Sequence, residues 1–138
     1  MATFTIAWGV SDTDPSGQHT VTVTSAAEVD AALDRLRVDG PWPVDVYQDS
    51  WHPGEPTPPY GLQLVWGHPE RAAAAWLGPH PGYAVDPALS PWPEPVDHDQ
   101  DAAEPHRTQL TPATARSLVR DHIRTGHRPT GATWITPR

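Results

Sequence analysis

The chain has 138 residues, with 17 acidic side chains against nine arginines and neither lysine nor cysteine, and its formal net charge is −8. This length fits one domain spanning residues 1–138, and the absence of cysteine excludes disulfides and thiolate-bound metals. No segment approaches the roughly 20 apolar residues of a membrane-spanning helix, and residues 1–10 lack the basic and apolar regions of a signal peptide. We therefore expect a cytoplasmic protein.

The negative charge is concentrated in the middle of the chain. Residues 1–37 carry a net charge of −3 and residues 107–138 one of +5, whereas residues 38–106 hold eleven acids and one arginine, a net charge of −10. Nucleic acids and anionic membranes bind basic surfaces, so this distribution argues against both as partners and favours a cationic partner. An acidic surface can also simply keep a small protein soluble, and composition does not distinguish this role from binding of a cationic partner.

The first third of the sequence predicts a β-hairpin followed by a helix. Residues 3–8 (TFTIAW) and 19–24 (HTVTVT) are rich in β-formers and are separated by turn residues. Ser25, with Glu28 three residues later, has the spacing of a capping box, and the helix should end near residues 37–38, ahead of a Gly-Pro pair. The apolar positions at helical spacing, which we expect to be buried, are Val29, Ala32, Leu33 and Leu36.

The middle of the chain predicts several more strands. Residues 44–47 alternate apolar and polar side chains, so Asp45 should face away from the core, as should Asp49 beyond them. Residues 60–67 (YGLQLVWG) predict a strong strand. Residues 71–77 (RAAAAWL) fit a helix or a strand, and the bounding prolines favour a strand paired with the preceding one. Residues 82–85 predict another short strand.

The last quarter predicts a helix and a final strand. Thr111 is placed to be the N-cap, Pro112 occupies the first helical position, and Gly126 marks the end of the helix. A strand follows at residues 132–135. The apolar stripe of the helix consists of Ala115, Leu118, Val119, His122 and Ile123. Together the elements predict an α+β fold, with a mainly antiparallel sheet of about six to eight strands and two helices packed on it.

Two proline-rich segments, residues 49–59 and 86–105, are predicted to be loops. The second is long enough to be functional, and it can contain a short strand near Val96. Its residues 97–101 (DHDQD) resemble the start of a calcium-binding loop. However, the sixth and twelfth positions, which need Gly and Glu, are Ala102 and Thr108.

The remaining chemical motifs are missing. The histidines are scattered with no HExxH, and neither GxSxG nor a phosphate-binding loop occurs. We therefore expect no catalytic residue, no bound metal and no cofactor. The alternative is a metal-dependent enzyme that uses the Asp/His-rich loop.

The seven tryptophans fall into two groups. Four lie in predicted strands and are expected in the core: Trp8, Trp66, Trp76 and Trp134. Three lie in proline-rich loops, where an aromatic side chain can either anchor a protein interface or cover the edge of a small core: Trp42, Trp51 and Trp92.

The C-terminal third resembles the end of Imm1-type immunity proteins. The resemblance rests on residues 110–112 (LTP) opening a helix, an Ala115–Arg116 pair within it, residues 125–129 (TGHRP) after it, and a closing Trp134. The first half is similar only in architecture, with a starting strand, an early helix and a strand of the LQL type followed by glycine. Residues 91–107 depart most from the family pattern, because prolines and aspartates stand where a cleaner strand is expected.

The resemblance implies a non-enzymatic inhibitor that binds a cognate secreted toxin, often a nucleic-acid deaminase. Such a toxin presents a basic substrate groove, which acidic loops could occupy. An adaptor for an unrelated protein is a further alternative. The expected partner-binding residues combine acidic positions with two loop tryptophans: Asp45, Asp49, Trp51, Glu55, Trp92, Asp97, Asp99, Asp101 and Glu104.

Arg116, Arg120 and Arg124 lie four residues apart on the last predicted helix. If they point away from the acidic loops, the molecule has an acidic binding side and a basic back. If they pack beside those loops, they neutralise them, and the predicted interface weakens.

Overall fold

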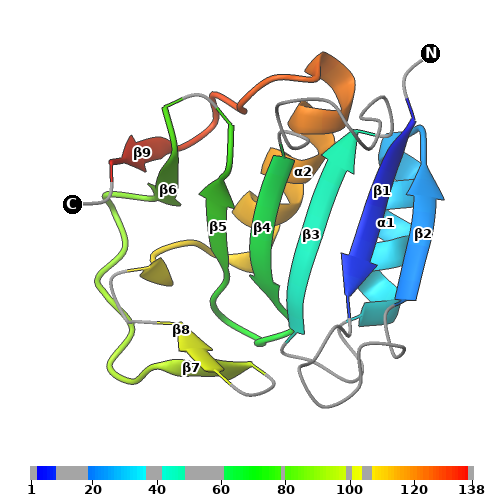
Figure 1. Cartoon of the computed structure of the whole chain (residues 1–138). Coiled ribbons are helices and arrows are strands. Elements are labelled where there is room, and N and C mark those ends of the chain that lie inside the picture. Colours follow the sequence, from blue (N-terminus) through cyan, green and yellow to red (C-terminus); the bar gives the residue numbers. More distant parts are fainter. Residues whose placement is uncertain are drawn as a thin grey trace.

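The computed structural model describes residues 3–8, 19–36, 42–48, 61–78, 80–98, 101–103 and 107–136, with the backbone alone for residues 42, 97, 98 and 101–103. Seven strands form an antiparallel sheet in the order β2-β1-β3-β4-β5-β6-β9, and two helices pack on it (Figure 1). This confirms the predicted α+β fold. The elements are β1 Phe4–Trp8, β2 His19–Val23, α1 Ala26–Leu36, β3 Trp42–Gln48, β4 Gly61–Trp66, β5 Ala73–Trp76, β6 Gly82–Val85, β7 Val96–His98, β8 Asp101–Ala103, α2 Pro112–Thr125 and β9 Thr133–Ile135.

Helix α1 begins and packs as its sequence predicts. The Ser25 hydroxyl accepts a hydrogen bond from the Glu28 amide at 3.3 Å. The Glu28 carboxylate reaches back one residue further than in a standard capping box, to the Thr24 hydroxyl and amide. These two bonds, the hydroxyl first, lower the pKa of Glu28. All four apolar positions predicted for this helix are buried.

Helix α2 likewise has both predicted caps. The Thr111 side chain accepts from the Thr114 amide at 3.2 Å, and Gly126 adopts a left-handed conformation with φ of 74°. The predicted stripe is buried at Ala115, Leu118, Val119 and His122, whereas Ile123 is partly buried against the core. In the described part of the chain, neither helix is long and apolar enough to cross a membrane.

The core lies between the two helices and one face of the sheet. Ile6, Val46, Leu62 and Trp76 are successive register partners across β1, β3, β4 and β5, and each is at most 4% exposed. Trp66 is buried beside them, and its indole N–H donates to the Leu33 carbonyl at 2.8 Å, which ties β4 to α1. Figure 1 shows both helices behind the sheet, so the core occupies a single layer.

His122 is a polar residue within this core. Its side chain is 1% exposed, between the rings of Phe4 at 5.2 Å and Trp76 at 5.4 Å between centroids. Nδ1 lies 2.9 Å from the His127 carbonyl, so Nδ1 carries the proton and donates to it. Nε2 is buried without a hydrogen-bond partner among the described atoms. Burial is the main cause of a lowered His122 pKa, so the ring is neutral near pH 7.

The predicted strands are present in the middle of the chain, and the structure differs from the prediction in two places. Of the predicted strand at residues 71–77, residues 73–76 form β5, which pairs with β4 as predicted. The loop expected at residues 86–105 contains the β7–β8 hairpin, so the suspected strand near Val96 exists and has a partner that was not predicted. Trp42, expected in a loop, is the first residue of β3 and the register partner of Trp66. Strands of three residues are too short to show an alternating pattern in sequence.

The arginines of α2 bind the aspartates of α1. Arg116 contacts both Asp30, at 3.2 Å, and Asp34, and its guanidinium lies 5.5 Å from the centre of the Trp66 ring. Arg120 also binds Asp30, and this contact is the largest cause of that carboxyl's lowered pKa. Arg124 pairs with Asp121 on its own helix. The arginines therefore follow neither of the two alternatives, because they pair with aspartates of the helices and not with the acidic loops.

Replacing Arg116 with alanine is expected to lower the free energy of unfolding by about 1–2 kcal/mol, because a largely buried guanidinium loses two carboxylates and an aromatic ring. The side chain of Arg116 is 17% exposed, whereas that of Arg124 is 73% exposed. Arg124→Ala is the matched control and should cost less than about 0.5 kcal/mol. Urea denaturation of the two variants measures the difference. Equal losses would contradict a structural role for the interhelical pairs.

Candidate protein-binding surface

The face of the sheet opposite the helices carries the candidate site. Side chains along a strand alternate between the two faces, and the register places every second residue of β1, β3, β4, β5 and β6 on this side. In the described part of the chain, no helix packs here, as Figure 1 shows from the front. We call this surface the uncovered face. Ala7 on β1 is buried there. Its half-buried or exposed residues are Thr5, Pro43, Asp45, Tyr47, Gln63, Val65, Ala73, Ala75 and Tyr83.

Asp45 occupies the middle of the uncovered face. Its register partners are Ala7 on β1 and Gln63 on β4, and Val44 and Val46 on either side of it are buried in the core. The prediction that Asp45 faces away from the core is therefore confirmed. Its carboxylate accepts one hydrogen bond, from Gln63 Nε2 at 3.3 Å. Among the described residues, no arginine or histidine forms an ion pair with it.

The surroundings of Asp45 make its negative charge costly. The carboxyl is half-buried, and this burial raises its pKa, while the bond from Gln63 offsets the rise only in part. A group that is desolvated without a counter-charge lowers the stability of the folded state once it is ionised. A position of this kind in an otherwise ordinary sheet is a candidate for function.

Asp45→Asn is expected to raise the free energy of unfolding near pH 7 by up to about 1 kcal/mol, because the amide keeps the shape and removes the buried charge. The folded-state pKa is raised, so the penalty exists above this pKa and disappears as the pH falls through it. The gain should therefore shrink toward pH 3. Urea titrations of both proteins at pH 3 and pH 7 measure it. A loss of stability at pH 7 would show that the fold needs the charge.

The other predicted partner-binding residues divide into two groups. Asp97 lies in β7 and Asp101 in β8, where the register pairs Asp97 with Ala102, and His98 with Asp101. These two aspartates thus belong to opposite strands of a hairpin, and not to one continuous acidic loop. Five predicted residues lie outside the described part of the chain: Asp49, Trp51, Glu55, Asp99 and Glu104.

Trp92 contacts its own chain on two sides. The Arg71 guanidinium lies 5.0 Å from the centre of its ring, and His68 packs edge-on at 5.3 Å. Arg71 also donates to the carbonyls of Ser90, at 2.7 Å, and Thr108, at 3.3 Å. The cluster attaches the segment that leads into β7 to the start of β5. Part of the Trp92 ring system is therefore engaged within the molecule, which leaves less of it for a partner.

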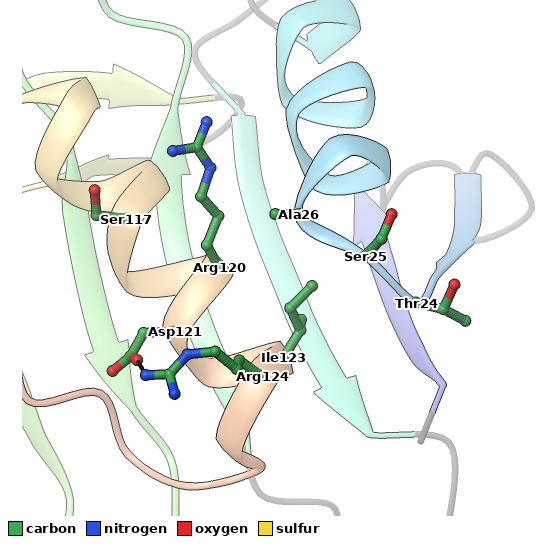
Figure 2. Close-up of a pocket in the computed structure, with 8 residues that line it drawn as sticks. All are labelled: Thr24, Ser25, Ala26, Ser117, Arg120, Asp121, Ile123 and Arg124. Carbon is green, nitrogen blue, oxygen red and sulfur yellow. Dashed lines mark hydrogen bonds and ion pairs between the residues drawn. The ribbon is translucent and has the colours of Figure 1, made fainter. Parts of the chain in front are cut away.

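A shallow pocket of about 430 Å³ lies on the other side of the molecule, between α2 and the start of α1 (Figure 2). Sequence analysis did not indicate it. Its two guanidinium groups are already paired, Arg120 with Asp30 and Arg124 with Asp121. The remaining lining residues are Thr24, Ser25, Ala26, Ser117 and Ile123. The pocket therefore offers no unpaired charge and no arrangement of groups for catalysis.

Neither metal chemistry nor known relatives point to another site. Among the described residues, no group of three histidine, aspartate or glutamate side chains could hold a metal ion.

Tyr47 and Gln63 are the residues of the uncovered face that sequence reasoning missed. Their signal was the alternation of apolar and polar residues, at 44–47 for Tyr47 and at 62–64 for Gln63. Comparisons of the chain with protein-family models, with curated proteins and with solved structures find no match.

Proposed function

We propose that this chain is an immunity protein that binds and neutralises a cognate secreted toxin in the cytoplasm of the producing cell. The toxin would be a nucleic-acid deaminase, and binding would cover its basic substrate groove or its active site. One observation supports the proposal most directly: on the sheet face where no helix of the described chain packs, Asp45 is a half-buried carboxylate that forms no ion pair with any described residue. The protein contributes no catalysis and acts by occupying a surface.

The charges of the described residues support a cationic partner. Most described arginines are engaged within the molecule, on aspartates, carbonyls or aromatic rings. The chain as a whole keeps a net charge of −8. An enzyme that acts on nucleic acid needs a basic groove to hold phosphates. Complementary charges would speed the encounter and select the partner, whereas buried contacts would set the lifetime of the complex.

The resemblance to Imm1-type immunity proteins supports the same proposal from a different part of the chain. Its residues form α2 and the segment that leads through the Gly126 cap to Trp134 in β9. Trp134 donates to the Pro129 carbonyl at 2.8 Å and packs partly against the core. This segment builds the scaffold, and the uncovered face on the other side of the sheet is left for the partner.

The proposal predicts that a gene beside the one for this chain encodes a secreted protein ending in a toxin domain, and that domain is the probe for the tests. Co-expression should restore growth to cells that produce the toxin, and the purified proteins should form a complex whose association slows as salt is added. Changing Asp97, Asp99, Asp101 and Glu104 together to their amides should lower the association rate at low salt by about tenfold or more.

Two outcomes would contradict the proposal at different levels. An unchanged association rate in the fourfold variant would remove these four residues from the interface. Failure of the unaltered chain to bind the toxin or to protect the cell would refute the immunity function itself.

A further inference from the structure

We infer that Asp45 and Gln63 together form the binding site for an arginine side chain of the protein partner. The inference rests on the proposed function. It adds where on the uncovered face one side chain of the partner binds, and which kind of side chain it is.

Asp45 and Gln63 together have more unused hydrogen-bond acceptors than unused donors. An ionised carboxylate offers two acceptor oxygens, and a primary amide offers one oxygen and two N–H groups. Gln63 Nε2 uses one N–H on Asp45 Oδ1, and this is the sole hydrogen bond of the two side chains within the described part of the chain. Asp45 Oδ2 and Gln63 Oε1 are left to accept. A ligand for this pair must therefore bring several donors and a positive charge.

An arginine fits the site better than a lysine. A guanidinium presents its donors in a planar fork that can bind two neighbouring acceptors at once, whereas an ammonium is a point charge. A guanidinium is also the more weakly hydrated cation, so it loses less on entering a half-buried site. Asp45 is half-buried, and the cost of its burial would be offset once a counter-charge arrives.

The two sides of the pair differ in the room that they leave for a long side chain. On the β1 side, Ala7, the register partner of Asp45, is 2% exposed, so this side of the carboxylate is covered. On the β4 side, Gln63 is exposed and its register partner Ala75 is small and half-buried. Tyr47 lies two residues further along β3 on the same face, opposite Gly61, which has no side chain. An arginine that approaches over Ala75 and Gln63 can therefore reach the carboxylate and place its guanidinium near an aromatic ring.

The first test measures binding of the neighbouring toxin domain to two variants. Asp45→Asn and Gln63→Ala should weaken the complex, the first by roughly 30-fold or more and mainly through faster dissociation. Asp34→Asn is the matched control: it makes the same change in net charge on α1, on the other side of the sheet, and should change the affinity less than about threefold. Equal effects of Asp45→Asn and Asp34→Asn would overturn the inference while leaving the immunity function intact.

The second test needs no partner, because the chain can supply the guanidinium itself. Ala75→Arg and the neutral control Ala75→Gln place a long side chain on the far side of Gln63. Binding of the guanidinium lowers the unfolding equilibrium constant of the arginine variant. The unfolding constant of the glutamine variant divided by that of the arginine variant should therefore be at least about threefold larger when Asp45 is retained than in the Asp45→Asn background. The same ratio in both backgrounds would show that the pair does not bind a guanidinium.

Discussion

Replacing Gly61 with alanine is expected to lower the free energy of unfolding by about 3 kcal/mol. A Cβ at this position would lie 2.1 Å from the Val46 carbonyl oxygen, far inside van der Waals contact. The obstructing atom belongs to the backbone of β3, which is hydrogen-bonded on both sides in the sheet, so no side-chain rotation relieves the overlap. The strands β3 and β4 would have to separate where Tyr47 pairs with Gly61. Chemical denaturation of the purified variant measures the loss.

Two other glycines provide graded controls for this experiment. At Gly82 a Cβ would lie 2.8 Å from the Ile135 carbonyl oxygen, which belongs to the edge strand β9 and can shift outward, so Gly82→Ala should cost about 1 kcal/mol. At Gly131 the nearest atom is 3.7 Å away, and Gly131→Ala should change stability by less than about 0.5 kcal/mol. A different order among the three variants would contradict the close approach of β4 to β3.

The stability of the protein is expected to fall as the pH drops below 6.5 because of His122. The ordinary pKa of histidine is near 6.5, and burial lowers that of His122 in the folded state. Above pH 6.5 the ring is neutral in both states, so it has no effect. Below pH 6.5 the imidazole of His122 is protonated in the unfolded chain but stays neutral in the folded protein. The free energy of unfolding then declines by at most about 1.4 kcal/mol per pH unit until the folded pKa is reached.

His122→Leu removes the titrating group and should remove this decline. The variant loses the bond from Nδ1 to the His127 carbonyl, so it should be less stable by about 1 kcal/mol at pH 7.5. The difference from the unaltered protein should narrow as the pH falls. His127→Gln removes an exposed histidine from the same turn and serves as the control, which should keep most of the decline, because burial is the main cause of the lowered His122 pKa and the charge of His127 a smaller one. Thermal unfolding measured at half-unit steps of pH distinguishes them, and a decline that persists in His122→Leu would assign it to other groups.

The helices were predictable because their signals are local in sequence. Ser25 and Thr111 each bond to an amide three residues away, and Gly126 ends α2 through a bond to the carbonyl four residues back. Most strands were also predictable from alternation. The order of strands was not, because β1 pairs with β3 across an intervening strand and helix. The hairpin of β7 and β8 was not predicted because three residues cannot show a period of two.

The candidate site was predictable only in part. Alternation and charge together indicated Asp45, and the structure confirms its orientation. The lack of a counter-charge around it could not be foreseen, because its neighbours Ala7 and Gln63 come from two other strands, and Gln63 lies 18 residues away in sequence. The arginines of α2 show the same limit. Their spacing left open whether they form a basic surface, because the aspartates that pair with Arg116 and Arg120 lie on α1, more than 80 residues earlier in the sequence.

The single-layered core has a consequence for how this protein can evolve. Along β3 and β4, one set of alternate residues packs against the helices and the other set faces outward. Apart from Gly61, where a Cβ would clash with β3, the outward positions can be substituted without changing the core. Under the proposed function, a lineage could therefore exchange one partner for another without rebuilding its fold. In a family of such chains, sequence divergence along these strands should therefore rise and fall with a period of two, with the fastest change around position 45 when partners differ and the slowest when they are shared.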